Sequence, residues 1–179
     1  MTLVSSKVRR GFTLIELLVV IAIIGILSAV VLASLNTART KGNDASVKSN
    51  LDTIRTQSAI FYDTNNGYST CPSGTCTAVT ASATTGSVAA CAVVGTMFKD
   101  DANIKAAIVA ADKAAGGNGT PSVTYCANTV GSSSAGITTW AVATPLSAAA
   151  STSWCVDSTG ASKQEAVAAS SAIVGVTCI

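Results

Sequence analysis

One uninterrupted apolar run near the N-terminus constrains this chain more than any other feature. From Leu17 to Ala33 every residue except Ser28 is apolar or glycine. With its apolar flanking residues the run reaches about 20 residues, which is enough for a helix to cross the hydrocarbon core of a membrane. The run contains no proline, so a helix can continue through it. We therefore predict a hydrophobic membrane-spanning helix over residues 12–35.

A single carboxylate, Glu16, stands at the head of this run. An acid inside a membrane is costly, and such residues are usually paired and functional. Lys7, Arg9 and Arg10 precede it, and the first 15 residues contain no acid. Under the positive-inside rule, this basic cluster predicts a single pass with a cytoplasmic N-terminus.

The predicted helix continues beyond the apolar run as an amphipathic segment, residues 36–63. Apolar or small residues recur there at steps of four and three, which places them on one stripe of a helix: Val47, Leu51, Ile54, Ser58 and Phe61. Asn65-Asn66-Gly67 predicts the end of the helix. Gly42-Asn43-Asp44 is a weak point, where a bend or a short break is expected.

Residues 64–179 are predicted to form a globular head of α+β class. A second helix is expected from Asp100 or Asp101, which can cap it, to about Ala115. Segments rich in β-branched or aromatic residues predict strands at about 122–128, 137–144 and 152–158, with a possible fourth strand at 172–178. Short connections favour an antiparallel sheet, whose apolar face would pack on the helical stripe. The predicted fold is thus a long N-terminal helix packed against a small antiparallel sheet.

The cysteines are confined to the head. An even number of them beyond a membrane helix predicts disulfides in an oxidising compartment. Sequence proximity favours three pairs: Cys71 with Cys76, Cys91 with Cys126, and Cys155 with Cys178. Zinc is the competing reading of Cys71-x4-Cys76, but no second close pair follows and the chain has no histidine.

Acidic residues in the head offer little catalytic chemistry. The absence of histidine excludes His-based triads and His-ligated metal sites. Asp100, Asp101, Asp112 and Asp157 are interpreted as solvated surface acids, since none lies in a run with calcium-loop spacing. No cofactor and no metal are expected. Trp140 and Trp154 fall in predicted strands and are interpreted as core or interface residues.

The order Gly11-Phe12-Thr13-Leu14-Ile15-Glu16, after a short basic leader and before the apolar helix, closely resembles the class III signal of type IV pilins and of the related pseudopilins of type II secretion. The match is specific over about residues 7–35. In layout it extends further, because that family places an N-terminal helix before a small α+β head.

This resemblance implies a processing site and an assembly site. A prepilin peptidase would cleave between Gly11 and Phe12, releasing residues 1–11, and would methylate the new amino terminus on Phe12. Glu16 would become the fifth mature residue, where the family has its acid. The α-amine of Phe12, in the same subunit or a neighbour, is the expected partner of the Glu16 carboxylate.

The function implied is that of a filament subunit, not an enzyme. Expected partners are copies of the chain and related minor pilins, the prepilin peptidase, the membrane and an inner-membrane assembly platform. The alternative within the family is a pseudopilin that forms a periplasmic piston for protein export. This alternative implies a calcium site in the head near Asp157, because major pseudopilins of type II secretion often hold calcium there. There are three further alternatives. An ordinary secretory signal or a simple one-pass anchor would leave the order of residues 11–16 unexplained. A membrane-anchored enzyme or binding module would lack a catalytic constellation.

Charge argues against a nucleic-acid partner. The chain has 11 basic and 9 acidic residues, and the leader carries three of the basic ones. Without the leader, 8 basic residues would face 9 acidic ones, a net charge of −1. A nucleic-acid binder normally keeps a basic face.

Overall fold

The computed structural model describes residues 11–70, 91–92, 95–119, 122–130, 137–148 and 151–179. The chain divides into two compact units, Met1–Arg39 and Thr40–Ile179, and each is described by itself. The helix α1, Leu14–Asn65, begins in the first unit and ends in the second. It agrees with the predicted long helix to within three residues at each end.

The helix is continuous through Gly42-Asn43-Asp44, so the short break expected as one outcome at this weak point does not occur. Glycine in a helix costs only about 1 kcal/mol relative to alanine. Tertiary interactions close by offset that cost, since Asp44 is buried and both of its carboxylate oxygens accept main-chain hydrogen bonds, from Ser147 and Ala148. Local propensity is therefore overridden by docking of this part of α1.

Two further helices follow: α2, Met97–Asp100, and α3, Ala102–Ala114. The predicted cap of the second long helix is confirmed, because the Asp101 carboxylate accepts hydrogen bonds from the N–H groups of Asn103 and Ile104. The helix ends at the predicted glycine pair, where Gly116 adopts a φ of 93°, a conformation that favours glycine.

A four-stranded antiparallel sheet has the order β1-β2-β3-β4. Its strands are β1, Tyr125–Val130; β2, Ile137–Pro145; β3, Ser153–Asp157; and β4, Ser162–Glu165. The first three overlap the predicted strands. The fourth differs, because the predicted segment 172–178 forms a separate hairpin of β5, Ile173–Val174, and β6, Thr177–Cys178. Polar β4 lacks the alternation that marks a strand in sequence, and its pairing with β3 is what makes it one.

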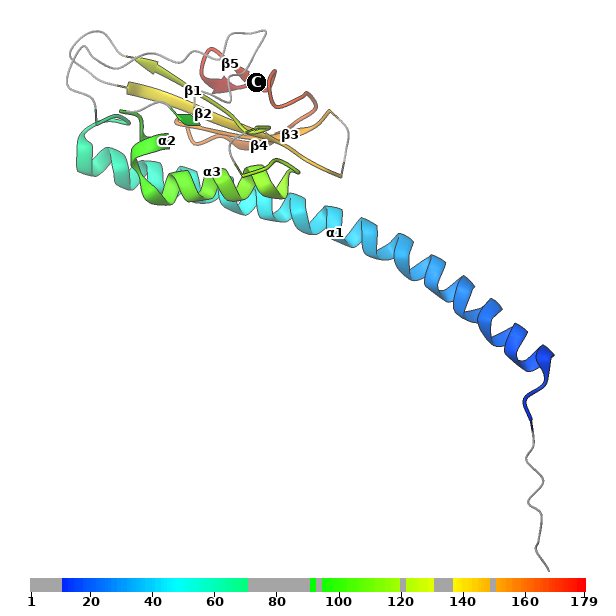
Figure 1. Ribbon diagram of the computed structural model, residues 1–179. Coiled ribbons are helices and arrows are strands. Elements are labelled where there is room, and N and C mark those ends of the chain that lie inside the picture. Colours follow the sequence, from blue (N-terminus) through cyan, green and yellow to red (C-terminus); the bar gives the residue numbers. More distant parts are fainter. Residues whose placement is uncertain (1–10, 71–90, 93–94, 120–121, 131–136, 149–150) are drawn as a thin grey trace, which may run out of the picture. The chain divides into compact units, whose positions relative to one another are not determined.

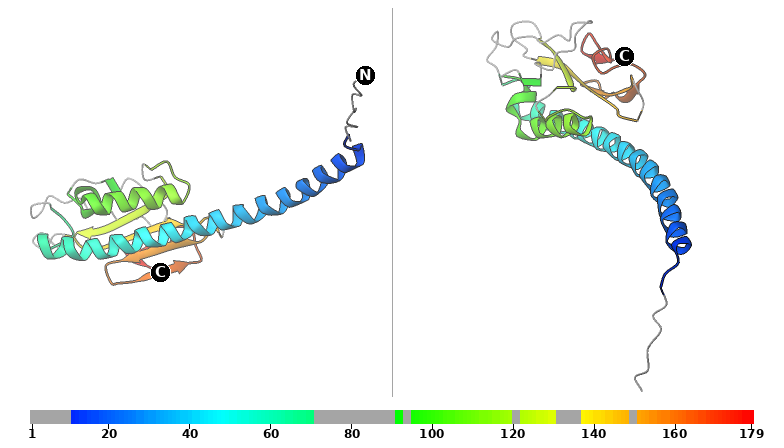
Figure 2. Two further views of the ribbon diagram at one scale, coloured as in Figure 1. Left: turned by 90° about the horizontal axis from the view of Figure 1, so that it is seen from below. Right: turned by 45° about the vertical axis from the view of Figure 1, so that its right-hand side comes forward.

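One face of the sheet packs on the helices, as predicted (Figure 1). The stripe of α1 is buried there, with Val47, Leu51 and Ile54 all fully inaccessible to solvent. Figure 2 shows α3 beside the C-terminal half of α1 on this same face. The sheet contributes alternate residues to this core: Cys126, Trp140, Val142 and Val156.

The opposite face of the sheet is covered by residues 166–179, here called the C-terminal strap (Figure 1). The sheet residues on this face are small, namely Ala127, Ala141, Ala143 and Cys155. The strap covers them with Ala169, Ala172, Ile173 and Val176. Both faces of the sheet are therefore buried, one against helices and one against the strap.

Two disulfides are present within the described ranges, one on each side of the sheet. Cys91 pairs with Cys126, which ties the segment before α2 to β1, and Cys155 pairs with Cys178, which ties β3 to β6. These are two of the three pairs that sequence proximity favoured. Cys71 and Cys76 lie outside the described residues.

Four polar or charged side chains of α1 contact the sheet or the loops that connect its strands, and we call them the clasp row: Asp44, Lys48, Asp52 and Arg55. The Lys48 ammonium lies 4.7 Å from the centroid of the Trp154 ring on β3. Asp52 accepts a 2.8 Å hydrogen bond from the Ser162 hydroxyl, and Arg55 donates one of 3.3 Å to the carbonyl of Gly160. The clasp row thus contacts the β3–β4 edge at successive points.

The stripe predicts a large effect of truncating its central residue. Leu51→Ala should lower the free energy of unfolding of the head by about 2–5 kcal/mol, because it removes a fully buried side chain and leaves a cavity. Urea unfolding of the full chain in detergent, followed by tryptophan fluorescence, measures this. Thr53→Ala, on the exposed face of α1 two residues away, is the matched control and should change stability far less. Equal effects of the two substitutions would contradict this packing.

Candidate processing and assembly site

The start of α1 is organised by two side chains, Thr13 and Glu16. The Glu16 carboxylate accepts hydrogen bonds from the main-chain N–H of Thr13, at 2.9 Å, and from its hydroxyl, at 2.8 Å. In return, the Thr13 hydroxyl accepts from the N–H of Glu16 at 3.3 Å. This reciprocal arrangement is a capping box, which satisfies N–H groups that have no partner within the helix. Glu16 was singled out from the sequence for its charge alone, although Thr-x-x-Glu before an apolar run also signals this capping role.

Gly11 and Phe12 lie immediately before this cap and are exposed. Phe12 is 89% accessible. A Cβ atom built on Gly11 meets no other atom within 4 Å, and the φ of Gly11 is not in the left-handed region. Nothing within the described structure therefore requires glycine at this position. The basic residues Lys7, Arg9 and Arg10 lie outside the described residues.

The apolar segment makes no internal core. Every Phe, Leu, Ile and Val side chain from Phe12 to Leu35 is at least 49% exposed. Within the described ranges, α1 is one helix that is long and apolar enough to cross a membrane. Among the described residues of its own unit, nothing covers this apolar surface, and such a surface is typical of a helix that contacts lipid or other protein.

Two acids interpreted as solvated are in fact buried, and that interpretation was wrong for both. Asp112 is fully buried, and its carboxylate accepts main-chain hydrogen bonds from Gly119, Ser122, Val123 and Thr124. Burial raises the pKa of the Asp112 carboxyl, but these hydrogen bonds outweigh it and leave the pKa below its ordinary value. The carboxylate therefore organises the turn after α3, a role that spacing in sequence does not reveal.

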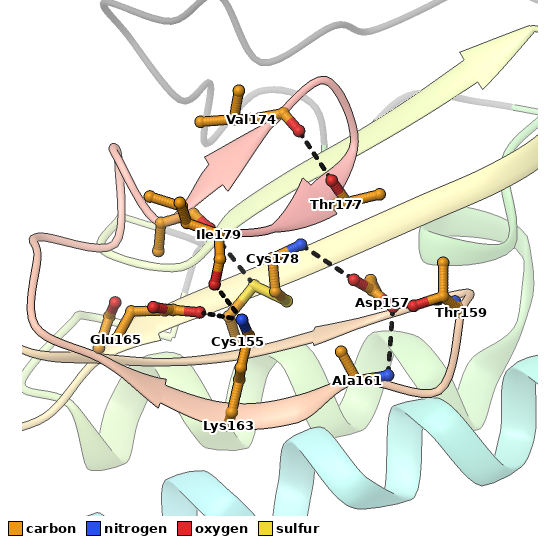
Figure 3. The surroundings of a disulfide bond; sticks show 12 residues. Cys155, Asp157, Thr159, Ala161, Lys163, Glu165, Val174, Thr177, Cys178 and Ile179 are labelled. Carbon is orange, nitrogen blue, oxygen red and sulfur yellow. Dashed lines mark hydrogen bonds and ion pairs between the residues drawn. A yellow bond between two sulfur atoms is a disulfide. The ribbon is translucent and has the colours of Figure 1, made fainter.

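Asp157 is the second buried acid, and it fastens the C-terminal strap (Figure 3). One carboxylate oxygen accepts from the N–H and hydroxyl of Thr159 and from the N–H of Ala161, and the other accepts from the N–H of Cys178. Burial raises the pKa of Asp157, whereas the hydrogen bonds from Thr159, Cys178 and Ala161 lower it further than burial raises it. Among the described residues, no three His, Cys, Asp or Glu side chains are grouped to hold a metal ion.

Trp140 is buried, as predicted, and packs edge-on against Tyr68 and Phe98. Trp154 is half-buried beside Lys48. Neither tryptophan lies near the start of α1 in the sequence. The candidate site therefore consists of residues 11–16 and the apolar surface that follows them.

Asp157→Asn is predicted to destabilise the head by about 1–3 kcal/mol at neutral pH, because an amide cannot accept from Cys178 and Thr159 at both of its polar atoms. A carboxyl whose pKa is lowered by folding stabilises above its ordinary pKa of about 4, and that contribution is lost as pH falls through the folded-state value. The difference between the two proteins should therefore shrink on acidification. Urea unfolding at several pH values measures it, with Asp63→Asn at an exposed position of α1 as control. A constant difference across this pH range would contradict the assignment.

Comparison with known proteins bears on the same segment. The family model described as "Prokaryotic N-terminal methylation motif" matches residues 6–32. The "Type IV wide pilus major component PilA4" of Thermus thermophilus is 50% identical over 60 residues, which are 33% of this chain and 45% of that protein. The "Type IV major pilin protein PilA" of Myxococcus xanthus is 38% identical over 61 residues, 34% of this chain and 28% of that protein.

The match spans less than half the length of these curated relatives. No solved structure was found to match the chain. The methylation motif, the two relatives and the α+β fold together support the type IV pilin family for this chain.

Proposed function

We propose that this chain, a member of the type IV pilin family by these comparisons, is a structural subunit of a type IV pilus-like filament. The observation that carries this proposal is the capping box of Thr13 and Glu16 at the head of an exposed apolar helix, inside the matched methylation motif. The subunit is held in the inner membrane as a single pass with its N-terminus in the cytoplasm. It is then polymerised outside the membrane through α1.

Processing between Gly11 and Phe12 is supported by the finding that the described structure of the chain does not itself require glycine at position 11. Its Cβ position is open and its backbone conformation is available to any residue. A requirement for glycine would therefore come from an external binding site, such as that of a prepilin peptidase, which admits no side chain before the cleaved bond. The capping box begins two residues after Gly11, so cleavage would leave the helix start intact and produce a free amine on Phe12.

Assembly is assigned to Glu16 and the apolar surface that follows it. The Glu16 carboxylate is exposed and bonded only locally, to Thr13, within the described part of the chain. Among packed helices it would lose water and need a cation, and the amine of Phe12 in the same or a neighbouring subunit is the proposed partner. Further partners are related minor pilins and an inner-membrane assembly platform.

The mature N-terminus is the direct test of processing. Mass spectrometry of the protein purified from membranes should find an N-methylated Phe12. Gly11→Ala should accumulate the uncut chain, since the added methyl group disturbs nothing in the subunit itself. An N-terminus at Met1 or at Ser34 would overturn the proposal, in favour of a simple anchor or an ordinary secretory signal.

Two substitutions of Glu16 distinguish the role of its negative charge from its role in capping the start of α1. Glu16→Ala removes both, whereas Glu16→Gln keeps an oxygen that can accept from Thr13 but has no charge for an amine. Both variants should still be cleaved, and both should fail to form filaments that are visible by electron microscopy after shearing. Normal polymerisation of Glu16→Gln would show that capping, not charge pairing, is the function. Wild-type subunits that never form long external fibres would favour the pseudopilin alternative.

A further inference from the structure

A cavity of about 350 Å³ lies in the second unit, at the start of the clasp row. Lys41, Asp44, Ala45 and Lys48 of α1 form its helical wall. The other lining residues are Leu146 and Ala148, which follow β2, Thr152, which precedes β3, and Gln164 of β4. The lining thus combines apolar residues with polar ones, and two of its side chains are cationic.

Within the described residues, the Asp44 carboxylate in this wall forms no ion pair with either lysine. Asp44 is buried, and its two oxygens accept hydrogen bonds of 2.6 and 3.0 Å from the N–H groups of Ser147 and Ala148. In the ranges that the structure describes, one ion pair is formed, between Lys163 and Glu165. Neither Lys41 nor Lys48 has a described carboxylate oxygen within ion-pair distance of its ammonium nitrogen. Two ammonium groups therefore line the cavity without an anionic partner.

The position of one of these ammonium groups is fixed. Lys48 lies over the face of Trp154, 4.7 Å from the ring centroid. A cation–π contact orients the amine but leaves its N–H donors free of hydrogen-bond acceptors. Lys48 is half-buried and held in place, whereas Lys41, seven residues earlier on the same helix, is exposed.

We propose that this cavity binds a phosphate group, with Lys41 and Lys48 as its cationic ligands and the Gln164 amide as an additional donor. Lysine binds phosphate as a compact point charge, and two lysines with an amide match the several acceptor oxygens of that group. A cavity of this volume also accommodates a small glycerol-like substituent on the phosphate. The proposal does not depend on filament formation.

Such a phosphate has two sources, a lipid headgroup and a soluble phosphate ester. Sequence position favours the lipid, because Lys41 follows Leu35, the last residue of the predicted membrane segment, by fewer than two helical turns of α1. Anionic headgroups attract lysines placed close to the bilayer surface, by about five-fold in affinity for each lysine.

The experiment uses the full chain in phosphatidylcholine nanodiscs with and without phosphatidylglycerol, and follows tryptophan emission. Trp154 beside Lys48 is the reporter, and the second tryptophan, Trp140, is buried in the core. Inorganic phosphate, titrated against chloride at matched ionic strength, forms the soluble arm. The variant is Lys41→Gln with Lys48→Gln, and the control is Lys105→Gln with Lys113→Gln, which removes the same charge from exposed positions of α3.

We expect phosphatidylglycerol to change the emission of wild type and control alike, and the cavity variant to need at least about ten-fold more anionic lipid for the same change. A response to inorganic phosphate alone, also lost in the cavity variant, would assign the site to a soluble phosphate. Equal losses in the cavity and control variants would reduce the effect to net charge and overturn the proposal, as would the absence of any response. Lys41→Gln alone, at an exposed residue, provides a folded variant that should show a partial loss.

Discussion

Burial of the α1 stripe beneath the sheet is the interaction on which the rest of the head depends. Val47, Leu51 and Ile54 are fully inaccessible, and Trp140, Val142 and Val156 of the sheet pack in the same core. The core is completed by α3, which buries Ile104 and Ile108 against the same cluster. Removal of α1 would expose the sheet face and leave α3 without its neighbour. The helix that carries the proposed assembly surface is therefore also part of the core of the head.

Polar interactions then fix how the sheet lies on that helix. An apolar stripe alone permits sliding along the helix axis, because hydrophobic contacts are not directional. The clasp row supplies direction, since each of Asp44, Asp52 and Arg55 bonds to one particular group of the sheet or its loops. The result is a head whose register on α1 is set by hydrogen bonds and whose stability comes from burial.

Features marked by local periodicity were predictable from sequence, whereas features made by tertiary pairing were not. The stripe at steps of four and three, the cap at Asp101 and three strands rich in β-branched residues all follow from near neighbours in the chain. Strand β4 is polar, and only its pairing with β3 makes it part of the sheet. The same holds for Asp112 and Asp157, whose burial depends on loops that return to them from 7 to 21 residues away. At the candidate site the residues were singled out from the sequence, and the capping role of Glu16, although missed, was also readable there from Thr13-x-x-Glu16 before an apolar run.

The strap carries a consequence for the order in which the head is completed. Its residues follow those of the sheet in the chain, so a polypeptide that emerges N-terminus first forms the sheet before its cover is present. During that interval the alanines on the sheet face that the strap later covers would be exposed to water. The Cys155 thiol would have no Cys178 to pair with, whereas Cys126 precedes it in the chain. In the export that we propose for this chain, Cys155 would therefore be able to pair with a wrong thiol before Cys178 is present, and a catalyst of disulfide exchange would correct that pairing.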